Sequence, residues 1–87
     1  MIQKKEKEKC IINIYDGEWK NDRREGKGIF YFCTGAIYEG DFKNNIIDGF
    51  GKLIVQNRNR TLEFLGTLKI PSLDNPNFDP IYLFQFN

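Results

Sequence analysis

The sequence predicts an all-β fold, built as an antiparallel meander of β-hairpins. Three observations support this fold: a block of residues occurs twice, apolar and polar side chains alternate within each block, and turn-forming residues separate the alternating runs. Alternation with a period of two is typical of a strand that buries one face. Repetition at a fixed spacing is typical of a repeat architecture, in which each unit is one supersecondary element.

The repeated block begins with YDGEWKN at Tyr15 and with YEGDFKN at Tyr38, 23 residues later. Three glycines coincide at this offset, one within the block and two beyond it: Gly17 with Gly40, Gly26 with Gly49, and Gly28 with Gly51. A third, incomplete copy, FLGTLK, begins at Phe64, 26 residues after Tyr38. The polar segment NRNR at 57–60 accounts for the longer spacing, because surface loops tolerate insertions.

Each complete block is predicted to form two strands joined by a six-residue polar turn, which in the first copy is NDRREG at 21–26 and ends on Gly26. If Lys20 lies opposite Lys27, then Trp19 faces Gly28 and Gly17 faces Phe30. The second copy then places Phe42 opposite Gly51 and Gly40 opposite Leu53. We therefore expect an aromatic or bulky side chain to cover each bare glycine across the strand pair.

The connections between blocks should preserve the two faces of the sheet. A three-residue loop, CTG at 33–35, ends on Gly35, where hairpin loops of this length favour a left-handed residue. This loop places Phe30 beside Tyr38. A six-residue loop at 56–61 keeps the alternation and places Leu53 beside Phe64. The prediction is five successive strands between Tyr15 and Ile70.

Four segments are predicted along the chain. Residues 1–9 form a charged leader, and residues 10–70 form the β-sheet unit. Residues 71–80 form a linker, because three prolines with several Asn and Asp residues disfavour regular structure. Residues 81–87, beginning IYLFQF, are interpreted as a further apolar β segment. We expect this segment to act as a cap on the sheet or as an adhesive strand.

The repeat resembles the MORN (membrane occupation and recognition nexus) unit, which runs Tyr-x-Gly-x-Trp/Phe, a turn, Gly-x-Gly and a second strand. The residues that carry the resemblance lie between Tyr15 and Lys69: Tyr15, Gly17, Trp19, Gly26, Gly28 and Gly35, then Tyr38, Gly40, Phe42, Gly49 and Gly51, then Phe64, Gly66 and Leu68. The second copy departs from the pattern, because Gln56–Arg60 replaces the closing glycine turn. The resemblance implies an elongated, twisted, single-layer antiparallel sheet and a non-enzymatic role.

Composition argues against several other classes of function. The net charge is +1, from 13 basic and 12 acidic residues, and gives no argument for nucleic-acid binding. The chain has no histidine and only two cysteines, too few soft ligands for a zinc site, and we expect no cofactor. The first residues lack the apolar core of a signal peptide, and no apolar run is long enough to span a membrane. We therefore expect a cytoplasmic protein.

The aromatic side chains of the glycine-rich face are open to two interpretations. They could form a groove that holds a partner, or they could be the only core that the sheet has, which is the more common role of an aromatic stripe. The residues in question are Tyr15, Trp19, Phe30, Phe32, Tyr38, Phe42 and Phe64, with Tyr82, Phe84 and Phe86 of the terminal segment. On the opposite face, Ile29, Tyr31, Ile37 and Ile54 are further predicted contacts. Homo-oligomerisation through the terminal segment is a related expectation.

Charged residues suggest only weak sites. Asp16, Glu18, Glu39 and Asp41 could be a catalytic or Ca²⁺-binding set, but a solvated face with acids balanced by cross-strand bases is the simpler interpretation. A small basic cluster could bind anionic lipid: Lys20, Arg23, Arg24 and Lys27.

The predicted function is therefore a non-catalytic protein-interaction or scaffold module. The resemblance favours a small subunit or adaptor of a cytoskeletal or ciliary assembly. The alternative is a peripheral adaptor that binds anionic phospholipid headgroups at a membrane surface.

Overall fold

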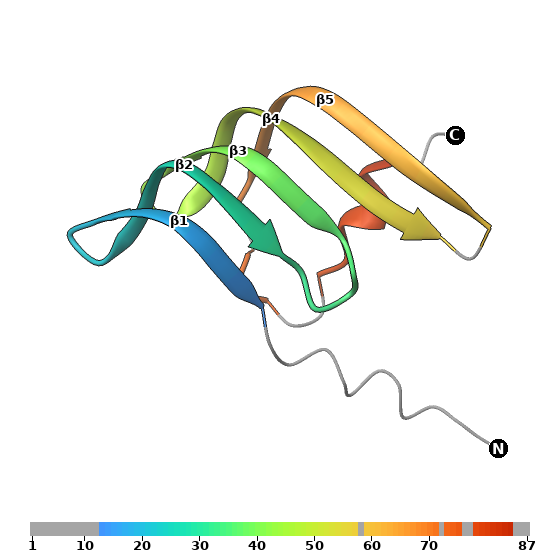
Figure 1. The fold of residues 1–87 in the computed structure, drawn as a ribbon, viewed down its shortest axis with the longest axis horizontal. Coiled ribbons are helices and arrows are strands. Elements are labelled where there is room, and N and C mark those ends of the chain that lie inside the picture. The colour runs from blue at the N-terminus through green and yellow to red at the C-terminus, as the bar shows by residue number, and fades with distance from the viewer. Residues whose placement is uncertain (1–12, 58, 72, 76–77, 85–87) are drawn as a thin grey trace, which may run out of the picture.

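A computed structural model describes residues 13–57, 59–71, 73–75 and 78–84. The predicted leader at 1–9 lies outside these residues, as do positions 10–12 of the predicted sheet unit. Five strands follow one another along the chain: β1 (Ile14–Lys20), β2 (Arg23–Tyr31), β3 (Ile37–Lys43), β4 (Ile46–Asn57) and β5 (Arg60–Ile70). They form one antiparallel sheet in the order β1-β2-β3-β4-β5, and Figure 1 shows the single curved layer. The predicted all-β meander is confirmed.

The hairpin turns are shorter than the sequence analysis expected. Lys20 pairs with Arg23, so the first turn consists of Asn21 and Asp22 alone, with φ angles of 53° and 64°. Asn44 and Asn45 form the second turn with φ angles of 53° and 78°. Two successive left-handed residues define the type I′ turn, whose twist matches that of paired strands. Asn and Asp tolerate this conformation better than other non-glycine residues.

The short turns change the register that the sequence analysis predicted. Gly17 lies opposite Gly28, not opposite Phe30, and Trp19 lies opposite Arg24, not opposite Gly28. The second hairpin repeats this arrangement, because Gly40 faces Gly51 and Phe42 faces Ile47. The predicted pairing of a bulky side chain with each glycine is therefore wrong.

A β-bulge in each hairpin accounts for the difference in register. Between the pairs Gly17–Gly28 and Trp19–Arg24, one residue of β1 lies opposite three residues of β2. Gly26 sits within this bulge at a φ of 72°, and Gly49 takes the same place in β4 at 136°. Such bulges favour glycine because one residue must adopt a positive φ. The repeated glycine that the sequence analysis assigned to the end of a turn is thus a bulge residue.

The first connection follows the prediction, and the connection between β4 and β5 is shorter than predicted. Gly35 has a φ of 102°, and the loop is closed by hydrogen bonds from Phe32 N to Ala36 O and from Gly35 N to Phe32 O, both 2.9 Å. Phe30 pairs with Tyr38. Strands β4 and β5 keep an unbroken register in which Leu53 faces Phe64, as expected. The predicted six-residue loop at 56–61 is wrong, because Gln56 pairs with Thr61 and Asn57 with Arg60.

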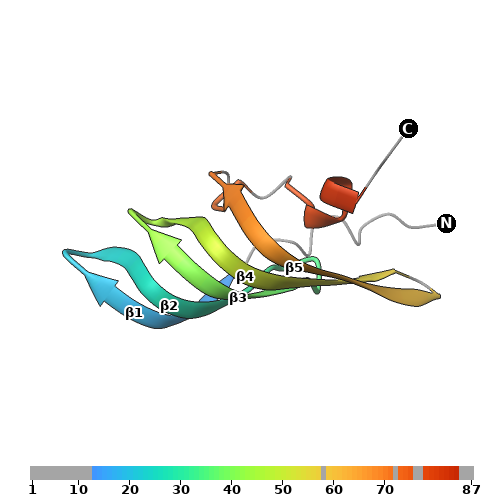
Figure 2. The same ribbon diagram turned by 90° about the horizontal axis from the view of Figure 1, so that it is seen from above.

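The two faces of the sheet differ in what covers them. The C-terminal segment, the described residues from 71 to 84, lies on one side of the sheet (Figure 2). We call this side the inner face and the opposite side, which is turned toward the viewer in Figure 1, the outer face. The core lies between the inner face and the C-terminal segment, and it consists of Phe30, Phe32, Ala36, Tyr38, Phe42, Ile47, Leu53, Val55, Ile70 and Leu73.

The end of the chain differs from the predicted β segment. Residues Pro80–Phe84 form a short 3-10 helix, η2, and residues 85–87 lie outside the described part. The β interpretation is therefore wrong for residues 81–84. Pro80 is fully buried and is the first residue of this helix. Its ring fixes φ at a value that suits the first turn of a helix. Within the described residues, no helix is long and apolar enough to cross a membrane.

Candidate protein-interaction surface

Four of the predicted partner-binding aromatics belong to the core. Phe30, Phe32, Tyr38 and Phe42 are buried on the inner face. Their rings pack edge to face, with centroids 4.8 Å apart for Phe30 and Phe32 and 5.4 Å apart for Tyr38 and Phe42. Aromatic pairs in this geometry add stability beyond the area they bury. These four side chains are not accessible to a partner while the C-terminal segment is in place.

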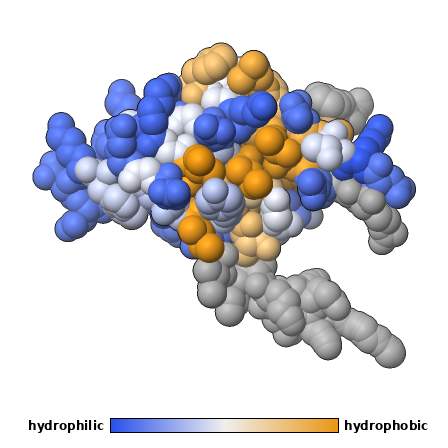
Figure 3. Space-filling view, in the orientation of Figure 1, coloured by the Kyte–Doolittle hydropathy of each residue, from blue (hydrophilic) through white to orange (hydrophobic). Residues whose placement is uncertain are grey.

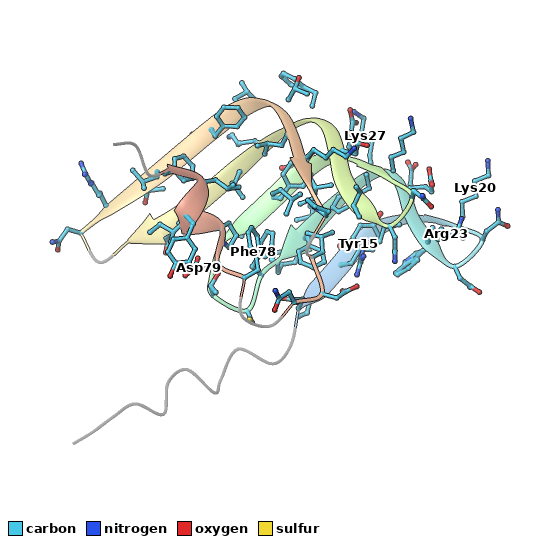
Figure 4. All side chains as sticks on the ribbon, turned by 180° about the vertical axis from the view of Figure 1, so that it is seen from behind. Tyr15, Lys20, Arg23, Lys27, Phe78 and Asp79 are labelled. Atoms are coloured by element: carbon cyan, nitrogen blue, oxygen red, sulfur yellow. The ribbon has the colours of Figure 1, made fainter. Side chains whose placement is uncertain are left out.

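The C-terminal segment covers the aromatic face that was one of the predicted binding surfaces for a partner. Leu73 is 2% exposed, and Phe78, Ile81 and Phe84 pack against the core cluster. Phe78 lies over the middle of the sheet in Figure 4, with its ring 6.2 Å from that of Phe32. The apolar face of the sheet is thus covered by the chain's own terminal segment, in the position expected of a cap.

Polar contacts hold the segment to the first hairpin. Arg24 Nη2 forms an ion pair with Asp74 Oδ1 at 2.9 Å, and Asn13 Nδ2 donates a hydrogen bond to Leu73 O at 3.2 Å. Arg24 also donates to Asn45 O at 2.6 Å, which joins β2 to the second hairpin turn. The guanidinium lies 5.2 Å from the centroid of the Phe30 ring, a distance at which cation–π attraction contributes.

The other predicted aromatics have more varied surroundings. Trp19 is 58% exposed beside the first hairpin turn, and its ring meets Tyr15 edge to face at 5.0 Å. Phe64 and Tyr82 are also exposed, whereas Tyr15 and Phe84 are partly buried. Phe86 lies outside the described residues. The structure therefore does not gather the ten predicted residues into one surface.

The outer face carries an apolar row that runs across four strands. Ile14 pairs with Tyr31, Tyr31 with Ile37, and Ile37 with Ile54. We call these four residues the apolar row. Ile14 and Tyr31 are exposed, at 56% and 39%, and the other two are partly buried. Three of the four were predicted from the alternation of the strands, and Ile14 was missed because its strand was expected to begin at Tyr15.

A shallow hollow continues the apolar row toward the other end of the strands. It is bordered by the apolar side chains of Ile29, Phe50 and Leu65, of which Phe50 and Leu65 are 54% and 65% exposed. Figure 3 shows apolar atoms running across this face between hydrophilic groups. Phe50 and Leu65 were also missed, although the alternation of side chains along β4 and β5 places both on the outer face.

The repeated acids are components of the hairpins. Glu18 Oε1 accepts a hydrogen bond from Lys27 N at 3.3 Å, and Asp41 Oδ2 accepts one from Phe50 N at 3.1 Å. Each acid thus satisfies a backbone amide that its bulge leaves without a strand partner. Asp41 also pairs with the Lys27 ammonium. The Lys27 ammonium and the Phe50 amide together lower the pKa of Asp41, because both stabilise the ionised form.

The predicted basic cluster is divided among three places. Lys20 and Arg23 face each other beside the first turn, and Figure 4 shows both at that end of the molecule. Lys27 lies on the outer face with Asp41. Arg24 is buried and ion-paired with Asp74. Of the four, Lys20 and Arg23 remain together as exposed cations, and Trp19 stands next to them.

Comparisons with known proteins agree with the repeat pattern. The MORN repeat model matches residues 15–37 and 38–60. MORN repeat-containing protein 3 of Xenopus laevis is 46% identical over 46 residues, which are 52% of this chain and 19% of that protein. Alsin of Homo sapiens and alsin of Rattus norvegicus are each 34% identical over 44 residues, which are 51% of this chain and 3% of alsin. The matched region is thus a small part of these relatives, and no solved structure matches the chain.

Proposed function

The chain belongs to the MORN-repeat family, whose repeats are generally protein- or lipid-binding modules, and on this premise we propose that it is a non-catalytic protein-interaction module. The binding surface is the outer face, where the apolar row meets the hollow beside Phe50 and Leu65. One observation supports this choice above others: among the described residues, the C-terminal segment covers the inner face, whereas Ile14 and Tyr31 of the apolar row are exposed. Exposed apolar surface of this kind is typical of interaction sites.

The partner we propose is a protein of a cytoskeletal or ciliary assembly in the cytoplasm, for which this chain is a small subunit or adaptor. This part of the proposal depends on the family alone. Purification of the tagged full chain with its partners, followed by mass spectrometry, identifies the protein. Its direct binding is then measured with purified components.

A pair of matched variants tests which face binds. The double variant Ile14→Ser, Tyr31→Ser removes two exposed apolar side chains from the outer face and should weaken binding at least about tenfold. Trp19→Ser removes a comparably exposed side chain from the other side of the sheet and should leave binding unchanged. Loss of binding with Trp19→Ser alone would contradict the proposal. Circular dichroism confirms that both variants remain folded.

A second function, binding to anionic phospholipid, is favoured by the first hairpin turn. An exposed tryptophan beside two cations is a combination found at membrane interfaces. Co-sedimentation with phosphatidylserine vesicles and with uncharged vesicles, at low and high salt, tests it. Binding that requires anionic lipid and falls about thirtyfold in Lys20→Ala, Arg23→Ala supports the lipid function, because each basic residue contributes about 1 kcal/mol near such a surface. If the chain sediments with neither kind of vesicle, the lipid function is rejected and protein binding remains the proposed function.

A further inference from the structure

A row of glycines crosses the sheet and ends at its last strand. The register pairs align one glycine from every strand, which we call the glycine row: Gly17, Gly28, Gly40, Gly51 and Gly66. In the first two copies of the repeat, the tyrosine of the first strand lies over its own glycine and over the glycine of the second strand. A Cβ built on Gly28 would meet Tyr15, and one built on Gly51 would meet Tyr38.

Strand β5 is the first strand of a repeat whose second strand is missing from the described residues. Phe64 takes the place of the tyrosine, and its ring lies over Gly66, with Cζ 2.9 Å from the position of a built Cβ. Beyond β5 the sheet has no further strand among the residues described. The backbone edge of β5 that is not paired with β4 therefore resembles the edge that β1 presents to β2 and the edge that β3 presents to β4.

The edge of β5 lacks three of the features that usually prevent edge-to-edge pairing, namely short length, proline and a bulge. The strand is 11 residues long, contains no proline, and keeps a continuous register with β4. The opposite edge strand, β1, is 7 residues long and its pairing is interrupted at the bulge. Long, regular edges accept another strand, whereas short and bulged edges do not. An incoming strand is therefore expected at β5.

The sequence of β5 is complementary to itself when two copies run antiparallel about Gly66. The inner-face residues then face one another, Phe64 against Leu68 and Gly66 against Gly66 of the second copy. On the outer face, Glu63 of each copy lies opposite Lys69 of the other. Moving the centre to Leu65 or Thr67 loses both the glycine pair and the opposite-charge pairs, and any odd shift places inner residues against outer ones.

We propose that a second copy of this chain pairs with β5, edge to edge and antiparallel about Gly66, which joins the two sheets into one. The contact is isologous and closed by two-fold symmetry, so it produces a dimer rather than a fibre. Backbone hydrogen bonds supply affinity, and the side-chain pairs on both faces set the register. The inference concerns the β5 edge and does not depend on the proposed outer-face contact.

Charge reversal tests the register directly. Glu63→Lys or Lys69→Glu places like charges opposite each other twice per dimer, and either change should weaken the dimer about tenfold in sedimentation-equilibrium measurements of the full chain. The double variant Glu63→Lys, Lys69→Glu restores opposite charges and should return the dissociation constant to within about threefold of the parent value. Arg60→Glu changes the charge of the same strand outside the paired segment and serves as the control matched to Lys69→Glu.

A second measurement reads the backbone rather than the side chains. Hydrogen exchange of the parent chain should slow at alternate amides of residues 62–70 as the protein concentration rises. Only every second amide of β5 points toward its unpaired edge, whereas the others point toward β4. A parent chain that is monomeric up to the millimolar range overturns the proposal. The proposal is also overturned if neither single charge reversal changes the dissociation constant of the dimer. The same holds if the double variant binds more weakly than the single variants.

Discussion

At the scale of single residues, the glycine row explains how a sheet this small encloses a core. Gly28 and Gly51 leave space on the inner face for the rings of Tyr15 and Tyr38, which lie flat along the strands. Tyr38 is completely buried in this position, and its ring meets Phe42. The glycines are therefore needed because they leave space for an aromatic ring. At the end of each ring, the tyrosine hydroxyl donates a hydrogen bond to a backbone carbonyl, Glu18 O for Tyr15 and Asp41 O for Tyr38.

The cost of filling this space should differ along the glycine row. A Cβ on Gly51 would lie within 2.5 Å of Tyr38 Cε1, a ring atom of a buried side chain that cannot move aside. The three atoms nearest to a Cβ on Gly66 all belong to the ring of Phe64, which is 38% exposed and therefore has more room to move. We expect Gly51→Ala to lower the free energy of unfolding by about 1–3 kcal/mol and Gly66→Ala to change it by less than about 1 kcal/mol. Urea unfolding of both variants measures the difference, and equal costs would contradict this account of the row.

Tyr38 should make stability depend on pH in the alkaline range. Its hydroxyl donates to Asp41 O at 3.1 Å and lies 3.3 Å from Phe50 O, and burial raises the pKa of Tyr38 to about 12. Above the ordinary tyrosine pKa of about 10, the unfolded chain releases this proton while the folded chain retains it, so stability falls as pH rises toward 12.

Tyr38→Phe isolates this effect. The variant should lose about 1 kcal/mol at neutral pH, where a buried hydrogen bond is removed, and should show a shallower loss between pH 10 and 12. Some dependence will remain, because burial also raises the pKa of Tyr15. Urea midpoints recorded across this range provide the measurement. An unchanged slope would show that Tyr38 does not cause the alkaline loss.

At the scale of the elements, the sequence predicted the strands well and the turns poorly. Alternation identified the five strands, and Gly35 identified the three-residue loop. The hairpin register came out wrong because Asn21–Asp22 and Asn44–Asn45 were read as parts of longer turns, although both pairs can adopt positive φ. With a two-residue turn, the remaining residues must be absorbed in the strand, which is the role of Gly26 and Gly49 in the bulges. A polar stretch closed by glycine does not by itself distinguish a long turn from a short turn followed by a bulge.

The contact between the first hairpin and the C-terminal segment depends unequally on its two charges. Arg24 is 9% exposed and bonds the second hairpin turn as well as Asp74, whereas the Asp74 side chain is 72% exposed. We expect Arg24→Ala to cost about 2–4 kcal/mol of unfolding free energy, because it removes several charged hydrogen bonds and the packing on Phe30. Asp74→Ala should cost less than about 1 kcal/mol, as exposed ion pairs do. Equal costs in thermal or urea unfolding would contradict this ranking.

At the scale of the whole molecule, the C-terminal segment compensates for the small number of repeats. Every strand pairs only with its neighbours in sequence, so the sheet by itself resembles a one-dimensional stack that can open from either end. Described residues of the C-terminal segment bond to Asn13, just before β1, and to Arg24 of β2, and they also pack on core residues of the later strands. Composition indicated an apolar terminus that needed covering, but no local pattern could show that Leu73 and Pro80 of the predicted linker would be buried with it, since their burial depends on where the sheet curves.

This bridging role predicts how the molecule opens. Leu73 is 2% exposed and its carbonyl accepts the bond from Asn13, so Leu73→Ala should remove about 2–4 kcal/mol and loosen the first hairpin selectively. In hydrogen exchange, amides of β1 and β2 should lose protection before those of β4 and β5, whose register is long and unbroken. Leu83→Ala is the matched control, because the same substitution at a side chain that is 45% exposed should change protection little. Equal loss over all five strands would instead mean that the sheet opens as one unit and that the C-terminal segment stabilises it only as a whole.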